Sequence, residues 1–194
     1  MAFRAKTRNT LAITLLATAC GGSPPAPEWQ ANAAGALQSF QHRYLIGDTK
    51  GAEDDFARAR FELTATGKAD LVARAELVRC AAQVASLVFE PCKGFEALRD
   101  GAGREELSYA DYLEGKVARS AGNEPLARLV SLAVQMRSGR IDPQGIAAAV
   151  DIASAQGWRR PLLAWLGVQL KRAQDAGDSE TAARLKRRIE LVSS

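Results

Sequence analysis

The side chains best suited to covalent or acid–base chemistry are few: three cysteines and one histidine among 194 residues. His42 lies between Gln41 and Arg43 in a segment with helical periodicity, where a partly exposed structural histidine is expected rather than a general base. No H-E-x-x-H, G-x-S-x-G or Gly-rich phosphate-loop motif occurs. The sequence therefore predicts no catalytic residue, no metal site and no cofactor, and thus a protein that is not an enzyme.

Adjacent acidic residues occur at Glu105-Glu106 and over residues 53–55. Neighbouring residues on a helix point in different directions, so neither group forms the facing carboxylate pair that acid–base catalysis needs. Negative charge is instead favourable at a helix N-terminus, because of the helix dipole. We therefore expect both groups to begin helices.

Two groups of residues are candidates for binding a partner. Tyr109 and Tyr112 are three residues apart and can line a concave groove, although such a pair more often belongs to the core. From residue 158 onward the chain has eight basic and four acidic residues. This asymmetry suits an acidic partner or anionic lipid head groups, and a solvated helix face explains it as well. The basic face comprises Arg184, Arg187 and Arg188.

The first 19 residues have the pattern of a secretory signal peptide. Three basic residues occur within the first eight positions, and an apolar run follows over residues 11–19. This run is shorter than the roughly 20 apolar residues that span a bilayer. Ala17 and Ala19 provide the small-x-small pattern that signal peptidase requires. We expect residues 1–19 to be removed on export.

The segment Leu-Ala-Thr-Ala-Cys at residues 16–20 resembles a bacterial lipobox. The resemblance implies that Cys20 receives a diacylglycerol thioether before cleavage. The usual lipobox has leucine three positions before the cysteine, whereas Leu16 lies four positions before it. Residues 20–27 are rich in glycine and proline and are predicted to form a flexible tether. Ordinary cleavage after Ala19 would instead release a soluble periplasmic protein.

The lipobox resemblance also implies a location. Two or more acyl chains on Cys20 would anchor the protein stably, where a single chain gives only marginal binding. Gly21 is, by resemblance to enterobacterial lipoproteins, the residue that accompanies sorting to the outer membrane. We therefore expect a palmitate-bearing lipoprotein of the cell envelope, on the outer membrane and facing the periplasm.

Cys80 and Cys92 remain as a pair if Cys20 carries lipid. An unpaired cysteine is unfavourable in an oxidising compartment, where disulfides form and persist. Pro91 cannot easily continue the preceding helix, so the chain turns back toward it. A disulfide between Cys80 and Cys92 is the preferred interpretation, and two buried free cysteines are the alternative.

The net charge of the chain is +4, with a calculated pI near 9.1. Three of the 26 basic residues lie in the signal peptide and none of the 22 acidic residues do, so the mature chain has 23 basic and 22 acidic residues. A balance of +1 provides no electrostatic footprint for a polyanion. We therefore expect no nucleic-acid partner.

Residues 28–194 are predicted to form a single all-helical domain, because apolar residues recur at three- to four-residue spacing and no stretch alternates like a strand. The segment 68–88 is apolar on nearly all sides, which predicts a helix in the middle of the fold. Helices are predicted over residues 27–46, 48–66, 68–88, 93–99, 105–121, 123–138, 142–156, 161–176 and 178–192.

The stretch 44–59 resembles the hinge and second helix of a tetratricopeptide repeat (TPR). A glycine turn is followed by Ala52, Phe56 and Ala59, the pattern that locks such a helical hairpin. Two more copies of the Gly-Asx-x-x-x-Ala signature occur downstream, without a fixed period and without the aromatic residue. The resemblance implies antiparallel helical hairpins stacked as a short, TPR-like right-handed solenoid. An irregular helical bundle is the alternative.

These observations lead to three functional hypotheses. The first is a membrane-anchored, non-enzymatic envelope lipoprotein that binds a protein or peptide partner on its helical surface, since helical repeats present concave surfaces. The second is a periplasmic hydrolase of cell-wall material, which requires an isolated buried carboxylate in a cleft. The third is a carrier of a small apolar ligand, which requires a cavity of a few hundred Å³.

Overall fold

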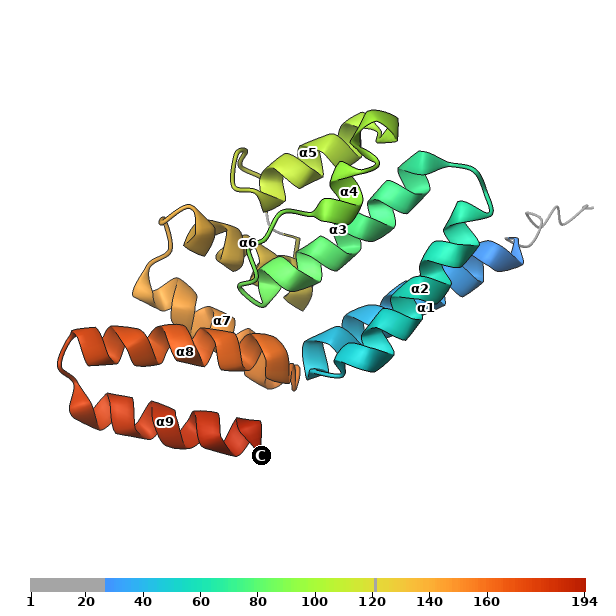
Figure 1. Ribbon diagram of the computed structural model, residues 1–194. Coiled ribbons are helices and arrows are strands. Elements are labelled where there is room, and N and C mark those ends of the chain that lie inside the picture. The colour runs from blue at the N-terminus through green and yellow to red at the C-terminus, as the bar shows by residue number, and fades with distance from the viewer. Residues whose placement is uncertain (1–26, 121) are drawn as a thin grey trace, which may run out of the picture.

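The computed structural model describes residues 27–120 and 122–194, so the expected signal peptide and the lipidation site Cys20 lie outside the described residues. All regular structure within the described residues is helical, as the ribbon in Figure 1 shows. The prediction of an all-α fold is confirmed.

The helices follow one another with short connections. Their bounds are α1 Glu28–Ile46, α2 Thr49–Thr64, α3 Ala69–Ala85, α4 Lys93–Glu96, a 3₁₀ turn η1 Arg99–Gly101, α5 Arg104–Leu113, α6 Pro125–Arg137, α7 Pro143–Ala155, α8 Arg159–Asp175 and α9 Ser179–Ser193.

Local capping residues set several helix boundaries. The side chains of Asp48, Asp142 and Asp178 each accept a hydrogen bond from the backbone N–H three residues on, at 2.9, 2.7 and 3.0 Å. These N-caps satisfy N–H groups that have no partner within the helix. Gly47 ends α1 in the left-handed conformation at φ 99°, which favours glycine.

α3 is the central helix of the fold. Ten of its 17 residues are buried, and it packs against α1, α2, α4, α5 and α6. Trp165 of α8 donates its indole Nε1–H to the carbonyl oxygen of Ala85 at the end of α3, at 3.1 Å. The predicted central position of this helix is confirmed.

Such packing differs from a regular stack of hairpins, in which each unit contacts only its neighbours. The predicted right-handed solenoid is not confirmed, and the helices that surround α3 are arranged more like the alternative, an irregular bundle. The α1–α2 hairpin that prompted the TPR resemblance is present, with Ala52, Phe56 and Ala59 at most 3% exposed.

The core has two clusters that meet at shared residues. One lies between the α1–α2 hairpin and α3, around Phe40 and Phe56, whose ring centroids are 5.2 Å apart. The larger one joins α3 to α5 through α9. Leu98, Leu126 and Trp158 are half-buried and pack against both clusters. Removal of this apolar surface from water is the main stabilising term in such a fold.

The fifth helix is shorter than predicted. We expected it over residues 105–121, but α5 ends at Leu113, and residues 114–120 continue as a loop. Gly115 adopts φ 78°, and the N–H groups of Gly115 and Lys116 donate to the carbonyl oxygens of Tyr112 and Asp111. This glycine closure ends the helix, and Val117, which follows it, is exposed.

The third helix ends three residues before the predicted position 88, and the chain then returns toward it. Leu87 has a positive φ of 60°, and Cys92 lies beside Cys80, with an S–S distance of 2.02 Å and a Cα–Cα distance of 5.9 Å. The predicted disulfide is present and closes the segment that leads into α4.

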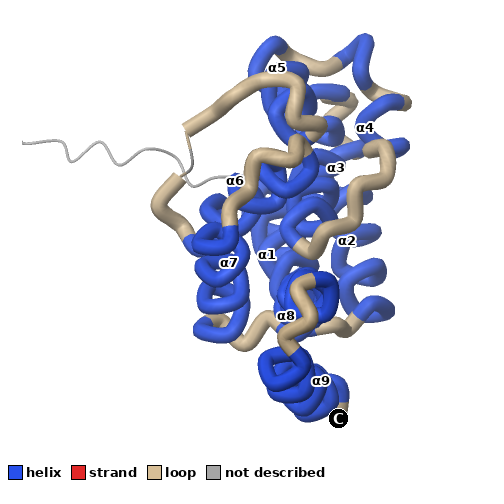
Figure 2. The backbone as a smooth tube through the Cα atoms, turned by 90° about the vertical axis from the view of Figure 1, so that its left-hand side faces the viewer, coloured by secondary structure: helices blue, strands red, loops and turns tan. Residues whose placement is uncertain are grey.

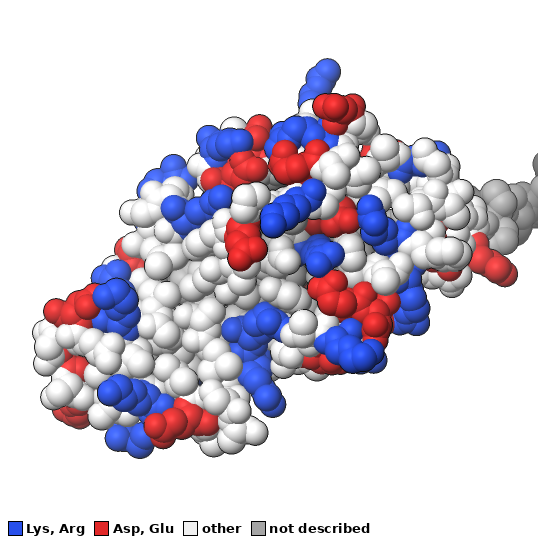
Figure 3. All heavy atoms as spheres, viewed as in Figure 1, with Lys and Arg blue, Asp and Glu red and all other residues white. Residues whose placement is uncertain are grey.

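The C-terminal hairpin forms one end of the molecule. α9 packs mainly on α8, and in Figures 1 and 2 it lies on the side opposite α5. Arg160 of α8 donates its Nε–H to the carbonyl oxygen of Tyr44 at 2.7 Å, which ties this end to α1. Figure 3 shows acidic and basic side chains interspersed over one face, with an uncharged band between α3 and α8.

Candidate binding site

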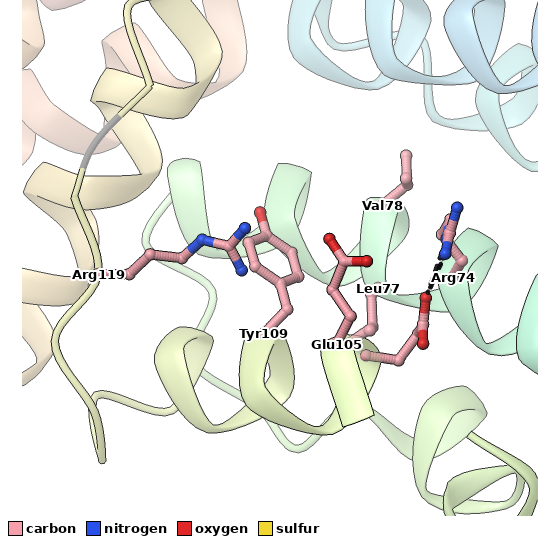
Figure 4. Close-up of a pocket in the computed structure, with 7 residues that line it drawn as sticks. Arg74, Leu77, Val78, Glu105, Tyr109 and Arg119 are labelled. Carbon is pink, nitrogen blue, oxygen red and sulfur yellow. Dashed lines mark hydrogen bonds and ion pairs between the residues drawn. The ribbon is translucent and has the colours of Figure 1, made fainter. Parts of the chain in front are cut away.

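A hollow of about 240 Å³ lies between α3, α5 and the loop that follows α5. Figure 4 shows that Glu105 and Tyr109 rise from α5 and that Arg119 reaches the hollow from the loop. One side of the hollow is therefore built by a helix that the sequence predicted, and the other by the loop that replaces its predicted end. The lining residues are Arg74, Leu77, Val78, Glu105, Glu106, Tyr109 and Arg119.

The floor of the hollow is apolar. Leu77 is 2% exposed and Val78 is half-buried. They lie on α3 one turn after Arg74, so these three side chains share the part of the helix that faces α5. Leu77 is already buried, so an occupant that covers this floor would mainly remove the remaining exposed surface of Val78 from water.

One wall is an ion pair between α3 and α5. Arg74 donates from Nε and Nη2 to the Oε1 atom of Glu106, at 2.9 and 2.7 Å. These hydrogen bonds are the main reason why the pKa of Glu106 lies below its ordinary value. Glu106 is 6% exposed, so the pair holds a buried charge and joins the two helices. We assign it a structural role.

Tyr109 and Arg119 form the second wall. The Arg119 guanidinium carbon lies 5.3 Å from the centroid of the Tyr109 ring, within cation–π range. Burial raises the pKa of Tyr109 above its ordinary value, so the phenol stays protonated and can donate a hydrogen bond. Tyr109 was predicted to bind a partner, and the structure places it at the hollow.

Glu105 and Arg119 have no ion-pair partner among the described residues. In Figure 4 the Glu105 carboxylate and the Tyr109 hydroxyl both point away from the axis of α5, in the same direction. Thus the hollow offers a carboxylate, a guanidinium and a phenol hydroxyl above an apolar floor. Glu105-Glu106 also begins α5, as predicted, while the acidic run at 53–55 lies within α2 rather than at its start.

Tyr112, the second predicted tyrosine, is only 5% exposed. Its ring centroid is 5.8 Å from that of Tyr109, so it supports the wall from the core. The paired tyrosines thus have different roles, because α5 turns one toward the hollow and the other toward the core.

The predicted basic face is separate from the hollow. Arg184, Arg187 and Arg188 lie on α9, and Figure 1 places α9 on the opposite side of the molecule from α5. Arg187 is exposed, and Arg188 donates to the Ser154 hydroxyl at 3.3 Å. Arg184 borders a second groove, between α7, α8 and α9.

Other buried carboxylates are paired with arginine. Asp55 receives a hydrogen bond from Ser39 and pairs with Arg43 and Arg58. The Oε1 atom of Glu76 lies 3.2 Å from Nε of Arg60, while burial raises its pKa.

The hydrolase hypothesis requires an isolated acid in a cleft. Among residues 27–120 and 122–194, each buried carboxylate is instead paired with arginine. His42 is exposed. Across the same residues no group of three or more His, Cys, Asp or Glu side chains could hold a metal ion.

Sequence reasoning missed Arg74, Glu105 and Arg119 as lining residues. The sequence did contain a signal for Arg74: it is one of four charged residues, with Asp70, Glu76 and Arg79, on a mainly apolar helix. Each such residue requires an ionic partner or solvent. No such signal marked Arg119, because its position depends on where α5 ends.

Comparison with known protein families, curated proteins and solved structures found no match to this chain. Within the part of the chain that the structure describes, every helix is too short or too polar to cross a membrane.

Proposed function

We propose that this protein is a lipid-anchored component of the bacterial cell envelope, attached through Cys20 to the outer membrane, that binds a peptide segment of a partner protein. The observation that carries the proposal is the hollow between α3 and α5, which Glu105, Tyr109 and Arg119 line beside an apolar floor.

The size of the hollow favours a peptide over a cofactor. Small-molecule sites usually measure about 300–1,000 Å³, and this hollow is smaller, at about 240 Å³. One apolar side chain of a peptide can cover Leu77 and Val78. A basic neighbour of that side chain would then pair with Glu105, and Arg119 and Tyr109 would donate to backbone carbonyl or carboxylate oxygens.

Two features support an envelope location. The first is the lipobox-like segment that ends at Cys20, followed by a glycine- and proline-rich tether. The second is the Cys80–Cys92 disulfide, since disulfides persist in the periplasm and are rare in the cytosol. The cell-wall hydrolase remains a hypothesis. None of the buried carboxylates among the described residues supports it, because each is paired with arginine.

Site-specific photo-crosslinking in cells tests the proposed peptide site. A benzophenone amino acid would replace Ser108, which is exposed on α5 between Glu105 and Tyr109, and a control probe would replace exposed Ala183 on α9. We expect a discrete adduct from position 108 that is lost when Glu105→Lys reverses the charge in the hollow. The matched variant Glu180→Lys, on exposed α9, should leave the adduct unchanged. An adduct that survives Glu105→Lys would contradict the proposed site.

A further inference from the structure

A second groove, of about 400 Å³, lies at the other end of the molecule, where α7, α8 and α9 meet. Its floor is aliphatic: Ile146, Ala173 and Leu185 come from three different helices and are at most 9% exposed. Pro143 and Ala176 extend this apolar lining. The groove falls within the roughly 300–1,000 Å³ of typical small-molecule sites.

Two arginines border the floor. Arg172 comes from α8 and Arg184 from α9, and neither has an acidic partner within ion-pair distance among the described residues. Arg184 donates from Nη2 to the Thr181 hydroxyl at 3.3 Å. Both guanidinium groups are exposed and can pair with an incoming anion.

The acidic residues nearby already have hydrogen-bond or ion-pair partners. Asp178 borders the groove, but its carboxylate caps α9 by accepting the Thr181 backbone N–H at 3.0 Å. That backbone hydrogen bond is the first cause of the lowered pKa of Asp178. Asp175 pairs with Lys171 at 3.0 Å. Asp178 stays ionised, so the charged lining residues Arg172, Arg184 and Asp178 give the groove a net charge of +1 beside a buried aliphatic floor.

We propose that this groove binds a fatty-acid-class amphiphile, with its carboxylate between Arg172 and Arg184 and its acyl chain over Ile146 and Leu185. Guanidinium groups suit a carboxylate because their N–H donors match its two oxygens. The aliphatic floor accounts for the apolar part of the ligand, which a charged surface alone would not select. This site is separate from the peptide hollow and does not depend on the lipid anchor.

Calorimetric titration with decanoate tests the proposal, using the full chain with Cys20→Ala so that no covalent acyl chain or detergent competes. We expect saturable binding at one site. Arg172→Gln and Arg184→Gln should each weaken binding about tenfold, the range for loss of a charge-assisted hydrogen bond. Arg187→Gln, an exposed arginine on the same helix, is the matched control and should bind like the parent.

Three comparison ligands separate the contributions. Acetate carries the head group without the long chain, and decyl maltoside carries an alkyl chain of similar length with a neutral head. We expect both to bind at least tenfold more weakly than decanoate, since each lacks one half of the recognised chemistry. Equal binding of either, equal loss in all three arginine variants, or no saturable binding of decanoate would overturn the proposal. Binding to phosphatidylglycerol vesicles without binding to monomeric decanoate would identify a membrane contact and would also overturn it.

Discussion

At the scale of single residues, the buried charges of this protein are distinguished by their partners. Glu106 and Asp55 have arginine and hydrogen-bond donors that lower their pKa values, with Arg74 the first cause for Glu106 and Ser39 for Asp55. Glu76 is also near an arginine, yet burial dominates and raises its pKa. Buried carboxylates that each lie beside an arginine therefore have opposite effects on the pH dependence of stability.

Removal of Arg74 tests the ion pair that joins α3 to α5. Arg74→Ala would leave the Glu106 carboxylate, 6% exposed, without its donors. We expect a loss of about 2 kcal/mol in the free energy of unfolding, measured by urea denaturation, because a buried charged group without its hydrogen bond is costly. The double variant Arg74→Ala with Glu106→Gln should regain part of this loss, since no buried charge remains. Equal losses in the single and double variants would contradict this explanation.

Glu76 and Glu106 should respond to pH with opposite signs. A raised pKa means that the folded state holds the proton more tightly, so the stability from Glu76 falls as the pH rises from its unfolded value of 4.5 through the folded pKa. For Glu106, whose pKa is lowered, the stabilisation is present above the unfolded value of 4.5 and is lost as the pH falls through the folded pKa.

The matched variants Glu76→Gln and Glu106→Gln measure these two contributions. As the pH falls from about 7 to about 3, any stability advantage of Glu76→Gln over the parent should decrease toward zero. The stability of Glu106→Gln relative to the parent should instead rise, because its deficit disappears. Unfolding free energies from urea titrations across this range provide the comparison. Relative stabilities that shift in the same direction on acidification would show that one of the assigned pKa directions is wrong.

At the scale of elements, the loop after α3 is constrained by covalent chemistry as well as by packing. Cys80 lies within α3 and Cys92 directly precedes α4, and their disulfide spans 12 residues of sequence. α4 has only four residues, too few to be stable alone. Its position against α3 therefore depends on packing and on the disulfide.

Replacement of both cysteines by serine should reduce stability by roughly 3 kcal/mol, the chain-entropy estimate for a loop of this length. Urea denaturation of the parent with and without reductant, beside the double variant, is the measurement. We expect reductant to lower the stability of the parent and to have no effect on the double variant. A parent that is insensitive to reductant, although its mass shows the disulfide to be reduced, would exclude a stabilising role for the disulfide.

At the scale of the whole molecule, the two candidate sites lie at opposite sides of the central helix α3. The hollow uses α3, α5 and the following loop, and the groove uses α7, α8 and α9. Since α8 and α9 pack chiefly on each other, on α7 and on α1 rather than on α3 or α5, each site can be altered with little effect on the other.

The proposed lipid anchor is tested by intact mass of protein extracted from membranes. We expect the mature chain to begin at Cys20 and to be heavier than its sequence by several acyl chains, with this excess absent from Cys20→Ala. The mass should also fall by two hydrogens relative to the reduced form, as the Cys80–Cys92 disulfide requires. An unmodified chain that begins at Cys20 would indicate a soluble periplasmic protein and would exclude the anchor.

The sequence by itself determined the helical class and most helix boundaries. Capping by Asp48, Asp142 and Asp178 involves atoms only three residues apart, so local sequence is sufficient to specify it. The end of α5 was missed because Gly115 closes the helix before an apolar residue that continued the pattern. Here two local signals conflicted, and the glycine closure prevailed.

Only the tertiary structure decided which side chains meet. Arg74 and Glu106 are 32 residues apart, and Trp165 is 80 residues from Ala85. Tertiary structure also decided the roles of Tyr109 and Tyr112. Periodicity places both on one helix, but Tyr109 faces the hollow and Tyr112 faces the core. Helical spacing defines a stripe along each helix. The orientation of that stripe toward a neighbour depends on how all helices pack around α3, because burial of apolar surface is non-directional and does not specify partners.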